Sequence, residues 1–296
     1  MKTFDHSELI DSVNLKRQMV EGKRLYAVEG AHYPSVTTVL SNQKKKKAII
    51  NRWRKRVGKE EADRVTKRST TRGTNFHAIC EDYIMNRLDL EKHKASPLPV
   101  QMFRTSQSVI DRIDRPRLVE SMLWSHTFKI AGQVDIIAEL DGVLSVIDFK
   151  TSKSPKRQNI LDGYFTQMCA YGYMFYERYG IEVEQFAVLV ACEDGECQLV
   201  KTTDKVTHYS NLKAAILEDI ENKFMTSTKF AGEIEKLVSD NADMNYIDAI
   251  VHFCEQNSIE VDSINKLVSK PLKEKLKYDA QRLNFIKKTS RAKLMF

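Results

Sequence analysis

Gly132-Gln-Val-Asp135 and Val146-Ile-Asp148-Phe-Lys150 are the most informative stretches of this chain of 296 residues. Both are typical of β-strands, and the Asp141-Gly142 turn between them folds one strand back on the other. Because strand side chains alternate between two faces, Asp148 and Lys150 point the same way, and the turn lets Asp135 join them. Two carboxylates and one ammonium at the rim of an apolar sheet suit a divalent metal that activates water against a phosphodiester.

The residue patterns on either side of these stretches predict an α/β fold with a mixed sheet. The predicted strands are 24–28, 118–128, 129–140, 143–149, 186–192 and 198–202. The predicted helices are a basic segment over 44–68, a helix that begins near Arg72, and the segments 102–112, 163–179 and 206–224. Pro97 and Pro99 are expected in a loop, and Ser35 is expected to cap a short helix that ends near Leu40.

Charge is unevenly distributed along the chain. The net charge is +7 with a pI of about 9.0, which favours a polyanionic partner such as nucleic acid. Between Lys44 and Arg72 there are 13 basic residues against Glu60, Glu61 and Asp63, so this segment alone has a surplus of ten. Trp53 adds a surface on which a base could stack. The segment therefore predicts a wall that guides DNA, and the alternative is a solvated helix face.

The cysteines and the apolar segments indicate in which cellular compartment the protein is expected. Five scattered cysteines without a C-x-x-C pair indicate free thiols in a reducing compartment. Cys192 and Cys197 have no third and fourth cysteine nearby, which argues against an iron–sulfur cluster. The sequence shows no signal peptide and no apolar run of membrane-spanning length, so we expect a cytoplasmic protein without a membrane partner.

The last 66 residues have a different character. The segments 246–255 and 271–283 predict amphipathic helices, with Ile247, Ile250, Val251 and Cys254 on one apolar stripe and Leu272, Leu276, Ala280 and Leu283 on the other. No strand is predicted there. We therefore expect two domains, 1–230 and an all-helical appendage 231–296 that has few apolar residues for a core of its own.

Five short motifs in order resemble the PD-(D/E)xK nuclease superfamily, in the branch that contains the RecB nuclease domain and the mitochondrial genome maintenance exonuclease. The motifs are Tyr33-Pro-Ser-Val-Thr37, Arg72-Gly-Thr-Asn-Phe-His77, Gly132-Gln-Val-Asp135, Ile147-Asp-Phe-Lys-Thr151 and Gln167-Met-Cys-Ala-Tyr171. The resemblance covers about residues 25–225, is strongest to phage members, and implies a restriction-endonuclease-like mixed sheet flanked by helices.

This resemblance implies a role for each matching residue. Asp135, Asp148, the Phe149 carbonyl and His77 would bind Mg²⁺ or Mn²⁺, and Asp135, Asp148, Lys150 and His77 would form the catalytic group. Lys150 would orient the attacking water or stabilise charge on the phosphate. The expected supporting residues are Gln167, Tyr171, Glu81 and Glu120. The residues expected to contact DNA are Lys45, Lys46, Arg52, Trp53, Arg56, Arg72 and Thr151.

Each of these assignments has an alternative without chemistry. Asp148 and Lys150 could form only a strand-end ion pair, His77 could be a buried core histidine, and Thr151 could only cap a turn. The aromatic side chains of Tyr164, Phe165, Tyr173, Phe175 and Tyr176 are expected to pack in the core.

The segment from about Ile234 resembles the late-transcription coactivator of T4-type phages. The similar pieces are Ile234-Glu-Lys-Leu-Val238, Met244-Asn-Tyr246, Phe253-Cys-Glu-Gln-Asn-Ser-Ile259 and Leu272-Lys-Glu-Lys275. The resemblance implies binding to the host RNA polymerase β flap and to the phage sliding clamp. The apolar tip Leu294-Met295-Phe296 follows a basic run, unlike the acidic-flanked tip of that family, and the alternative is a helical lid on the nuclease.

The sequence thus favours a metal-dependent DNA exonuclease that acts on single strands or exposed ends in phage DNA replication, recombination or degradation. The alternative is a phage late-transcription coactivator whose nuclease-like part mainly binds DNA. The polarity of digestion, endo or exo action, DNA or RNA preference and oligomeric state stay open.

Overall fold

The computed structural model describes residues 1–20, 23–224, 226–241, 243–256 and 261–286. The chain divides into two compact units, Met1–Asp219 and Ile220–Phe296. The expected functional boundary at 230/231 stays a prediction. In the described part of the chain, no helix combines the length and the apolar character that crossing a lipid bilayer requires.

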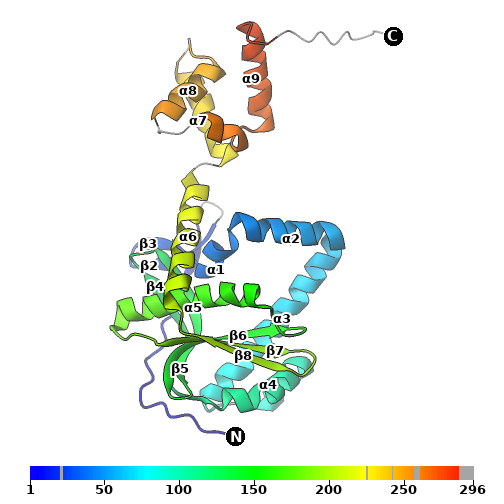
Figure 1. Cartoon of the computed structure of the whole chain (residues 1–296), viewed down its shortest axis with the longest axis vertical. Helices are drawn as coiled ribbons and strands as arrows, with labels where there is room; N and C mark the ends of the chain where they lie inside the picture. Colours follow the sequence, from blue (N-terminus) through cyan, green and yellow to red (C-terminus); the bar gives the residue numbers. More distant parts are fainter. Residues whose placement is uncertain (21–22, 225, 242, 257–260, 287–296) are drawn as a thin grey trace. The chain divides into compact units, whose positions relative to one another are not determined.

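A five-stranded mixed sheet forms the centre of the first unit (Figure 1). Its strands, in spatial order, are β4 (Ile113–Ser125), β5 (Ile130–Leu140), β6 (Val143–Ser152), β7 (Gln185–Cys192) and β8 (Cys197–Thr202). The β6–β7 pair is parallel and the other pairs are antiparallel, which confirms the predicted mixed α/β sheet.

The turn between β5 and β6 determines the register of the site strands. Asp141 and Gly142 both have positive φ, 55° and 79°, as a two-residue type I′ hairpin requires. The turn pairs Leu140 with Val143 and Ile136 with Ile147, which brings the Asp135 and Asp148 ends of the strands together. The predicted meander is therefore confirmed.

Helices cover both faces of the sheet (Figure 1). On one face α5 (Gln158–Tyr179), α1 (Val36–Ser41) and α6 (Lys205–Phe224) contribute to an apolar core. On the other face α3 (Lys59–Ile84) and α4 (Pro97–Ile110) form a second core. Because α5 connects parallel strands β6 and β7, it must cross over the sheet, and this crossing brings its residues beside the end of β6.

Two helix starts differ from the sequence prediction. The helix expected to begin near Arg72 already begins at Lys59 and continues to Ile84, because Gly73 is accommodated within it and lies near the Thr151 hydroxyl. Pro97 and Pro99, expected in a loop, occupy the first turn of α4, where a missing backbone N–H costs nothing.

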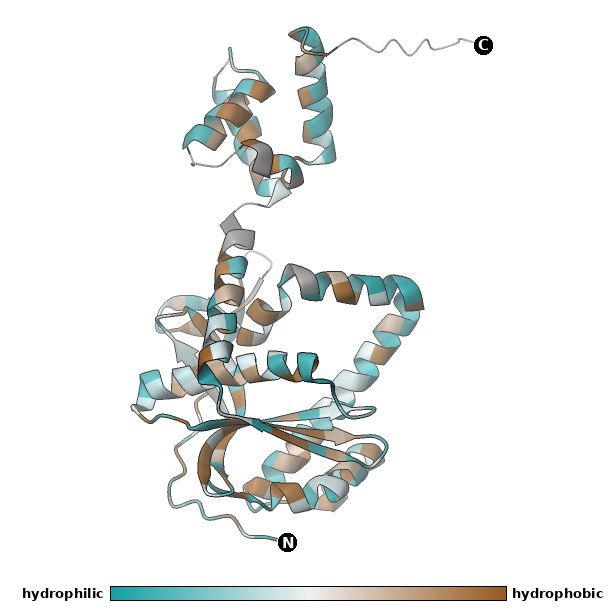
Figure 2. Ribbon diagram, in the orientation of Figure 1, coloured by the Kyte–Doolittle hydropathy of each residue, from teal (hydrophilic) through white to brown (hydrophobic). Residues whose placement is uncertain are grey.

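The predicted basic segment forms α2 (Lys44–Val57) and the first half of α3. Gly58 separates the two helices at φ 84° and ψ 158°, a conformation that glycine adopts far more readily than other residues. Figures 1 and 2 show that α2 and this half of α3 project from the sheet as a largely hydrophilic bracket. We call residues 44–71 the basic bracket.

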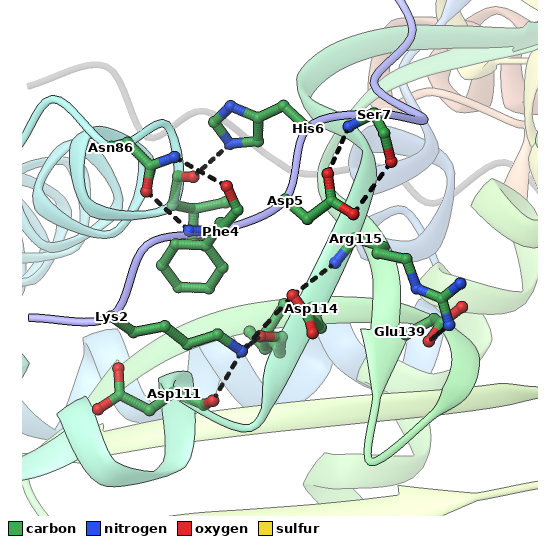
Figure 3. Close-up of polar contacts among 12 residues, drawn as sticks. Lys2, Phe4, Asp5, His6, Ser7, Asn86, Asp111, Asp114, Arg115 and Glu139 are labelled. Atoms are coloured by element: carbon green, nitrogen blue, oxygen red, sulfur yellow. Dashed lines mark hydrogen bonds and ion pairs between the residues drawn. The ribbon is translucent and has the colours of Figure 1, made fainter.

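The N-terminal segment holds the far end of α3 in place (Figure 3). The Asn86 side chain, just beyond α3, accepts a hydrogen bond from the Phe4 N–H and donates one to the Phe4 carbonyl, both at 2.9 Å. Phe4 is buried against Tyr83, and Lys2 donates to the Asp111 carbonyl at 3.1 Å, before β4 begins. These contacts fix α3, which carries His77, against the sheet.

A small antiparallel sheet packs beside β4 and β5. It consists of β1 (Arg17–Val20), β2 (Lys23–Val28) and β3 (Ala31–Pro34), of which only β2 was predicted. Its Tyr26, Val28 and Tyr33 share a core with Met122 and Trp124. Ser35, directly after β3, caps α1 by accepting from the Thr38 N–H at 3.0 Å, as predicted.

The described part of the second unit is helical, as predicted. It contains α7 (Ser227–Asp240), α8 (Tyr246–Gln256), the 3₁₀ segment η2 (Val261–Lys266) and α9 (Lys270–Arg282). Phe230, Ile234, Phe253, Ile264 and Leu272 are among the buried residues of a small apolar core in this unit. On α8, Val251 is exposed, and Ala249 and Phe253 take its place in the stripe, because the buried face is rotated. The tip 294–296 and the basic run at 287–293 lie outside the described residues.

Candidate active site

Three acidic residues align across neighbouring strands. The β4–β5 register pairs Val119 with Ile136 and Ser121 with Val134, so Glu120 lies opposite Asp135. The last β5–β6 pair is Ile136 with Ile147, and Asp135 and Asp148 are the next positions beyond it. Like charges at opposite positions repel, so a positive charge close to these three carboxylates would stabilise them.

Glu120 is held in an uncommon backbone conformation. Its φ is +45°, in the left-handed region, which costs a residue with a side chain about 1–2 kcal/mol. Gln133, from the Gly132-Gln-Val-Asp135 motif, fixes its carboxylate by donating from Nε2 to Oε2 at 2.8 Å. The fold therefore holds Glu120 beside Asp135 in spite of two opposing costs.

His77 reaches this row from α3, on the second face of the sheet. Its Nδ1 lies 3.5 Å from Oε1 of Glu120 and 3.5 Å from Oδ1 of Asp135. One possible ligand atom from each of the three side chains lies within 4.8 Å of the others, the spacing of a shared cation site. Phe76, Ile79 and Cys80, which flank His77 on α3, are buried in the core.

Where the β5–β6 pairing ends, backbone groups of Phe149 face the row of acidic residues. The Phe149 N–H, which has no strand partner there, donates to Oδ2 of Asp135 at 2.7 Å. The N–H and C=O of one strand residue face the same neighbouring strand, so the Phe149 carbonyl is directed to this side as well. This orientation is compatible with its expected role as a backbone ligand.

Asp148 and Lys150 are joined in an ion pair. Asp148 is only 2% exposed, and its Oδ2 contacts the Lys150 ammonium, which also lies 5.2 Å from the centre of the Tyr164 ring. A buried carboxylate without a counter-charge would be expensive, and the Lys150 ammonium supplies that counter-charge to Asp148. Asp148 lies outside the group formed by His77, Glu120 and Asp135.

The pKa shifts show that these groups form one electrostatic cluster. Burial, together with Asp135, raises the pKa of Asp148 to about 6 against the opposing effect of Lys150. Burial also raises the pKa of Glu120. Burial alone would lower the pKa of His77, but Asp135 and Glu120 raise it to about 11. The two acids and His77 therefore form a site that favours positive charge.

The donor set fits a hard divalent cation. Imidazole nitrogen, carboxylate oxygens and a backbone carbonyl are ligand types that Mn²⁺ accepts, and Mg²⁺ prefers the oxygens among them. A divalent ion would supply positive charge between these carboxylates. Among the described residues, Asp135 is the carboxylate shared by the ligands predicted from the sequence and the group of His77, Glu120 and Asp135 in the structure.

Gln167 and Tyr171 lie on α5, and the Tyr171 ring packs against Gly132 of β5. Gln167 donates from Nε2 to the Tyr171 hydroxyl at 3.3 Å. A Cβ at Gly132 would lie only 2.9 Å from the Tyr171 ring, so the glycine of the first motif permits this close packing. The two residues therefore position α5 against β5 at the site.

Arg72 and Thr151 contact each other. Arg72 is 8% exposed and donates from Nε to the Thr151 hydroxyl at 3.1 Å, and its guanidinium forms an ion pair with Glu193. Both residues were expected to contact DNA, but their bonds tie α3 to the exit of β6. Glu193 was not singled out in the sequence, since no spacing rule connects a helix residue with a turn 121 positions later.

The other residues expected to contact DNA lie on the basic bracket. Arg52 and Arg56 are exposed, Trp53 is half-buried, and the Lys45 side chain lies outside the described part of the structure. Lys46 is half-buried near Gly163 of α5, and burial lowers the pKa of its ammonium. Ile49 and Ile50 are 63% and 49% exposed between these basic residues.

Glu81, the other expected supporting acid, points elsewhere. Its Oε1 accepts from Arg87, which also binds Asp82 at 2.7 Å. The structure therefore separates the two supporting carboxylates. Glu120 belongs to the candidate metal group, and Glu81 belongs to a surface ion-pair network.

Comparison with known proteins identifies the family of the chain. The profile of the PD-(D/E)XK nuclease superfamily matches residues 91–255, and that of the phage late-transcription coactivator matches residues 223–295. Because the first match covers more than half of the chain, the chain belongs to the PD-(D/E)XK nuclease superfamily. Its C-terminal part is a segment of the coactivator type.

Individual relatives point to one protein group. The chain is 28% identical over 171 residues to Mitochondrial genome maintenance exonuclease 1 of Homo sapiens, covering 55% of this chain and 50% of that protein. It is 28% identical over 202 residues to the Xenopus tropicalis protein, covering 64% of this chain and 58% of that protein. The chain thus spans about half the length of the curated relatives it matches.

A solved structure described as that of an exonuclease from Eubacterium rectale is also similar. It covers 51% of this chain and 65% of its own, at 14% sequence identity and a TM-score of 0.35. At this score the likeness carries no argument about the site.

Proposed function

We propose that this chain is a metal-dependent DNA exonuclease. The observation that carries the proposal is the convergence of His77, Glu120 and Asp135 beside the Asp148–Lys150 pair, at the open end of the β5–β6 ladder. Superfamily membership and the similarity to mitochondrial genome maintenance exonucleases support it.

Each residue of the site has a role in this proposal. Asp135, Glu120, His77 and the Phe149 carbonyl would hold Mg²⁺ or Mn²⁺, joined by Asp148 when it leaves Lys150. The bound ion would polarise the scissile phosphate and lower the pKa of a water molecule. Burial would lower the pKa of Lys150, but Asp148 and Asp135 raise it, so the residue carries an ammonium that donates hydrogen bonds to the water or to the phosphate.

The basic bracket supports single-stranded or end-exposed DNA as substrate. Exposed Arg52 and Arg56 would bind phosphates, and exposed Ile49 and Ile50 would contact unstacked bases, which a duplex keeps inside its stack. If about five phosphates are bound, the logarithm of affinity falls with the logarithm of salt concentration at a slope of about −3.5. A phage role in replication, recombination or degradation is part of the proposal.

Cleavage of end-labelled DNA with Mg²⁺ or Mn²⁺ tests the proposal. We expect Asp148→Ala and Lys150→Ala to abolish cleavage, because each removes a group that acts on the metal or on the phosphate, while binding of single-stranded DNA persists. Lys213→Ala, at an exposed position of α6 outside the bracket and the site, is the matched control and keeps cleavage. Full activity in both site variants would reject the assignment.

A second function is favoured by the coactivator match over residues 223–295. We propose that this segment binds the host RNA polymerase β flap and the phage sliding clamp in a host cytoplasm. A pull-down with the full chain and a polymerase flap fragment tests it, with a chain that ends at residue 224 as control. Equal recovery of flap by both chains would contradict the proposal.

A further inference from the structure

Tyr164 lies beside the catalytic lysine, although its sequence context predicts only core packing. It is on α5, one turn before Gln167, and is half-buried. The centre of its ring is 5.2 Å from the Lys150 ammonium, within the range of a cation–π contact. Burial raises the pKa of the Tyr164 hydroxyl, so the ring stays neutral and presents its electron-rich face.

The position of the Lys150 ammonium depends on which partner Asp148 binds. In this structure its ammonium is held by Asp148, which is 2% exposed and is also an expected metal ligand. An Asp148 oxygen that binds a divalent cation loses much of its attraction for an ammonium, because the same charge is then shared. The lysine side chain has four flexible bonds and would move away unless another group held it.

The Tyr164 ring can hold the Lys150 ammonium without competition from the metal. Ring faces attract ammonium groups but are poor ligands for hard divalent cations, which select oxygen. Tyr164 also approaches Lys150 from α5, whereas Glu120, Asp135 and Asp148 are on the sheet and His77 is on α3. The ring therefore keeps its place whichever partner Asp148 takes.

We propose that Tyr164 is a positioning residue that holds the Lys150 ammonium at the scissile phosphate when Asp148 binds the metal. The inference rests on the proposed nuclease function and adds a residue to it. Tyr164 itself touches neither the metal nor the reacting atoms in this scheme. Its effect on the reaction is exerted through Lys150.

A series of ring substitutions in the full chain separates the electrostatic role from packing. Phe, 4-fluoro-, 3,5-difluoro- and 3,4,5-trifluorophenylalanine at position 164 keep nearly the same shape while the ring face becomes progressively less negative. We expect Tyr164→Phe to keep kcat within about threefold, and each added fluorine to lower it, to about tenfold in total. KM for single-stranded DNA and Mn²⁺ affinity by calorimetry stay unchanged.

The aliphatic variant and its control complete the test. Tyr164→Leu is expected to lower kcat about 10- to 30-fold, while Tyr176→Leu, on the same helix and 54% exposed, keeps wild-type kcat. An active wild type with a flat fluorine series would overturn the role of Tyr164 and leave the nuclease proposal intact. A wild type without cleavage would overturn both.

Discussion

At the scale of single residues, Glu120 is the side chain whose role the structure changes most. The sequence suggests Glu81 and Glu120 equally as supporting acids, one turn after His77 and on a strand respectively. The structure places Glu120 within the group of potential ligands and pairs Glu81 with Arg87. Two glutamates that look equivalent in the sequence therefore serve as a test and its control.

We expect Glu120→Gln to weaken Mn²⁺ binding by about tenfold or more, because it removes one anionic ligand without changing the shape of the side chain. Glu81→Gln should leave the affinity unchanged. Isothermal titration of the full chain with MnCl₂ measures both. Equal affinities for the two variants would show that the cation is held by Asp135 and Asp148 without Glu120.

At the residue level, the sequence predicts those contacts that follow from local spacing. Asp148 and Lys150 are two apart on one strand, and the Asp141-Gly142 turn determines what faces them, so their meeting could be foreseen. Glu120 and Glu193 could not be placed, because their partners depend on strand register and on the path of a turn. Tyr164 is expected in the core, since helical spacing of an aromatic residue does not indicate that a charged group such as the Lys150 ammonium lies beside it.

At the scale of elements, α6 contains a histidine whose surroundings oppose its charge. The His208 ring is buried beside Phe165 and Phe186, and its Nδ1 has no hydrogen-bond partner in the described structure. Burial lowers the pKa of His208, partly offset by Asp204 and Asp162. The unfolded chain, with a histidine pKa near 6.5, therefore binds this proton more readily than the folded chain does.

The sign of the pH effect follows from this difference. Stability is unaffected by His208 above about pH 6.5 and falls as the pH drops below it, because protonation favours the unfolded chain. We expect His208→Phe to remove this part of the loss between pH 6.5 and 5. Melting temperatures across pH 5–8 measure it, with His32→Phe at an exposed position of β3 as control. Parallel curves for wild type and His208→Phe would contradict the expectation.

Helix boundaries show the same limit of sequence reasoning. Strands β4 to β7 were predicted because their apolar residues form long runs, and α5 because its apolar residues recur at helical spacing. The start of α3 is not evident from the sequence, because Gly73 resembles a helix boundary, although a helix tolerates glycine at about 1 kcal/mol when packing holds it. The four-residue strands β1 and β3 were missed because such short segments have almost no pattern.

At the scale of the whole molecule, each unit has its own apolar core. The cores of the first unit use buried residues up to Ile216, and that of the second begins at Phe230. We expect a chain ending at Phe224 to fold, to melt within a few degrees of the first transition of the full chain, and to keep cleavage. Differential scanning calorimetry and the nuclease assay measure this. Loss of folding on truncation would show that the nuclease unit depends on the coactivator-type segment.

One consequence of α3 concerns how its length can change. This single uninterrupted rod carries exposed basic positions near Lys59, the Arg72 anchor in its middle and His77 beyond it. Each residue inserted between Lys59 and Arg72 would turn the outer positions by about 100° around the axis relative to the imidazole, since a turn takes 3.6 residues. Insertions of seven residues restore the original direction almost fully, whereas one or two would aim the cationic side away from the incoming strand.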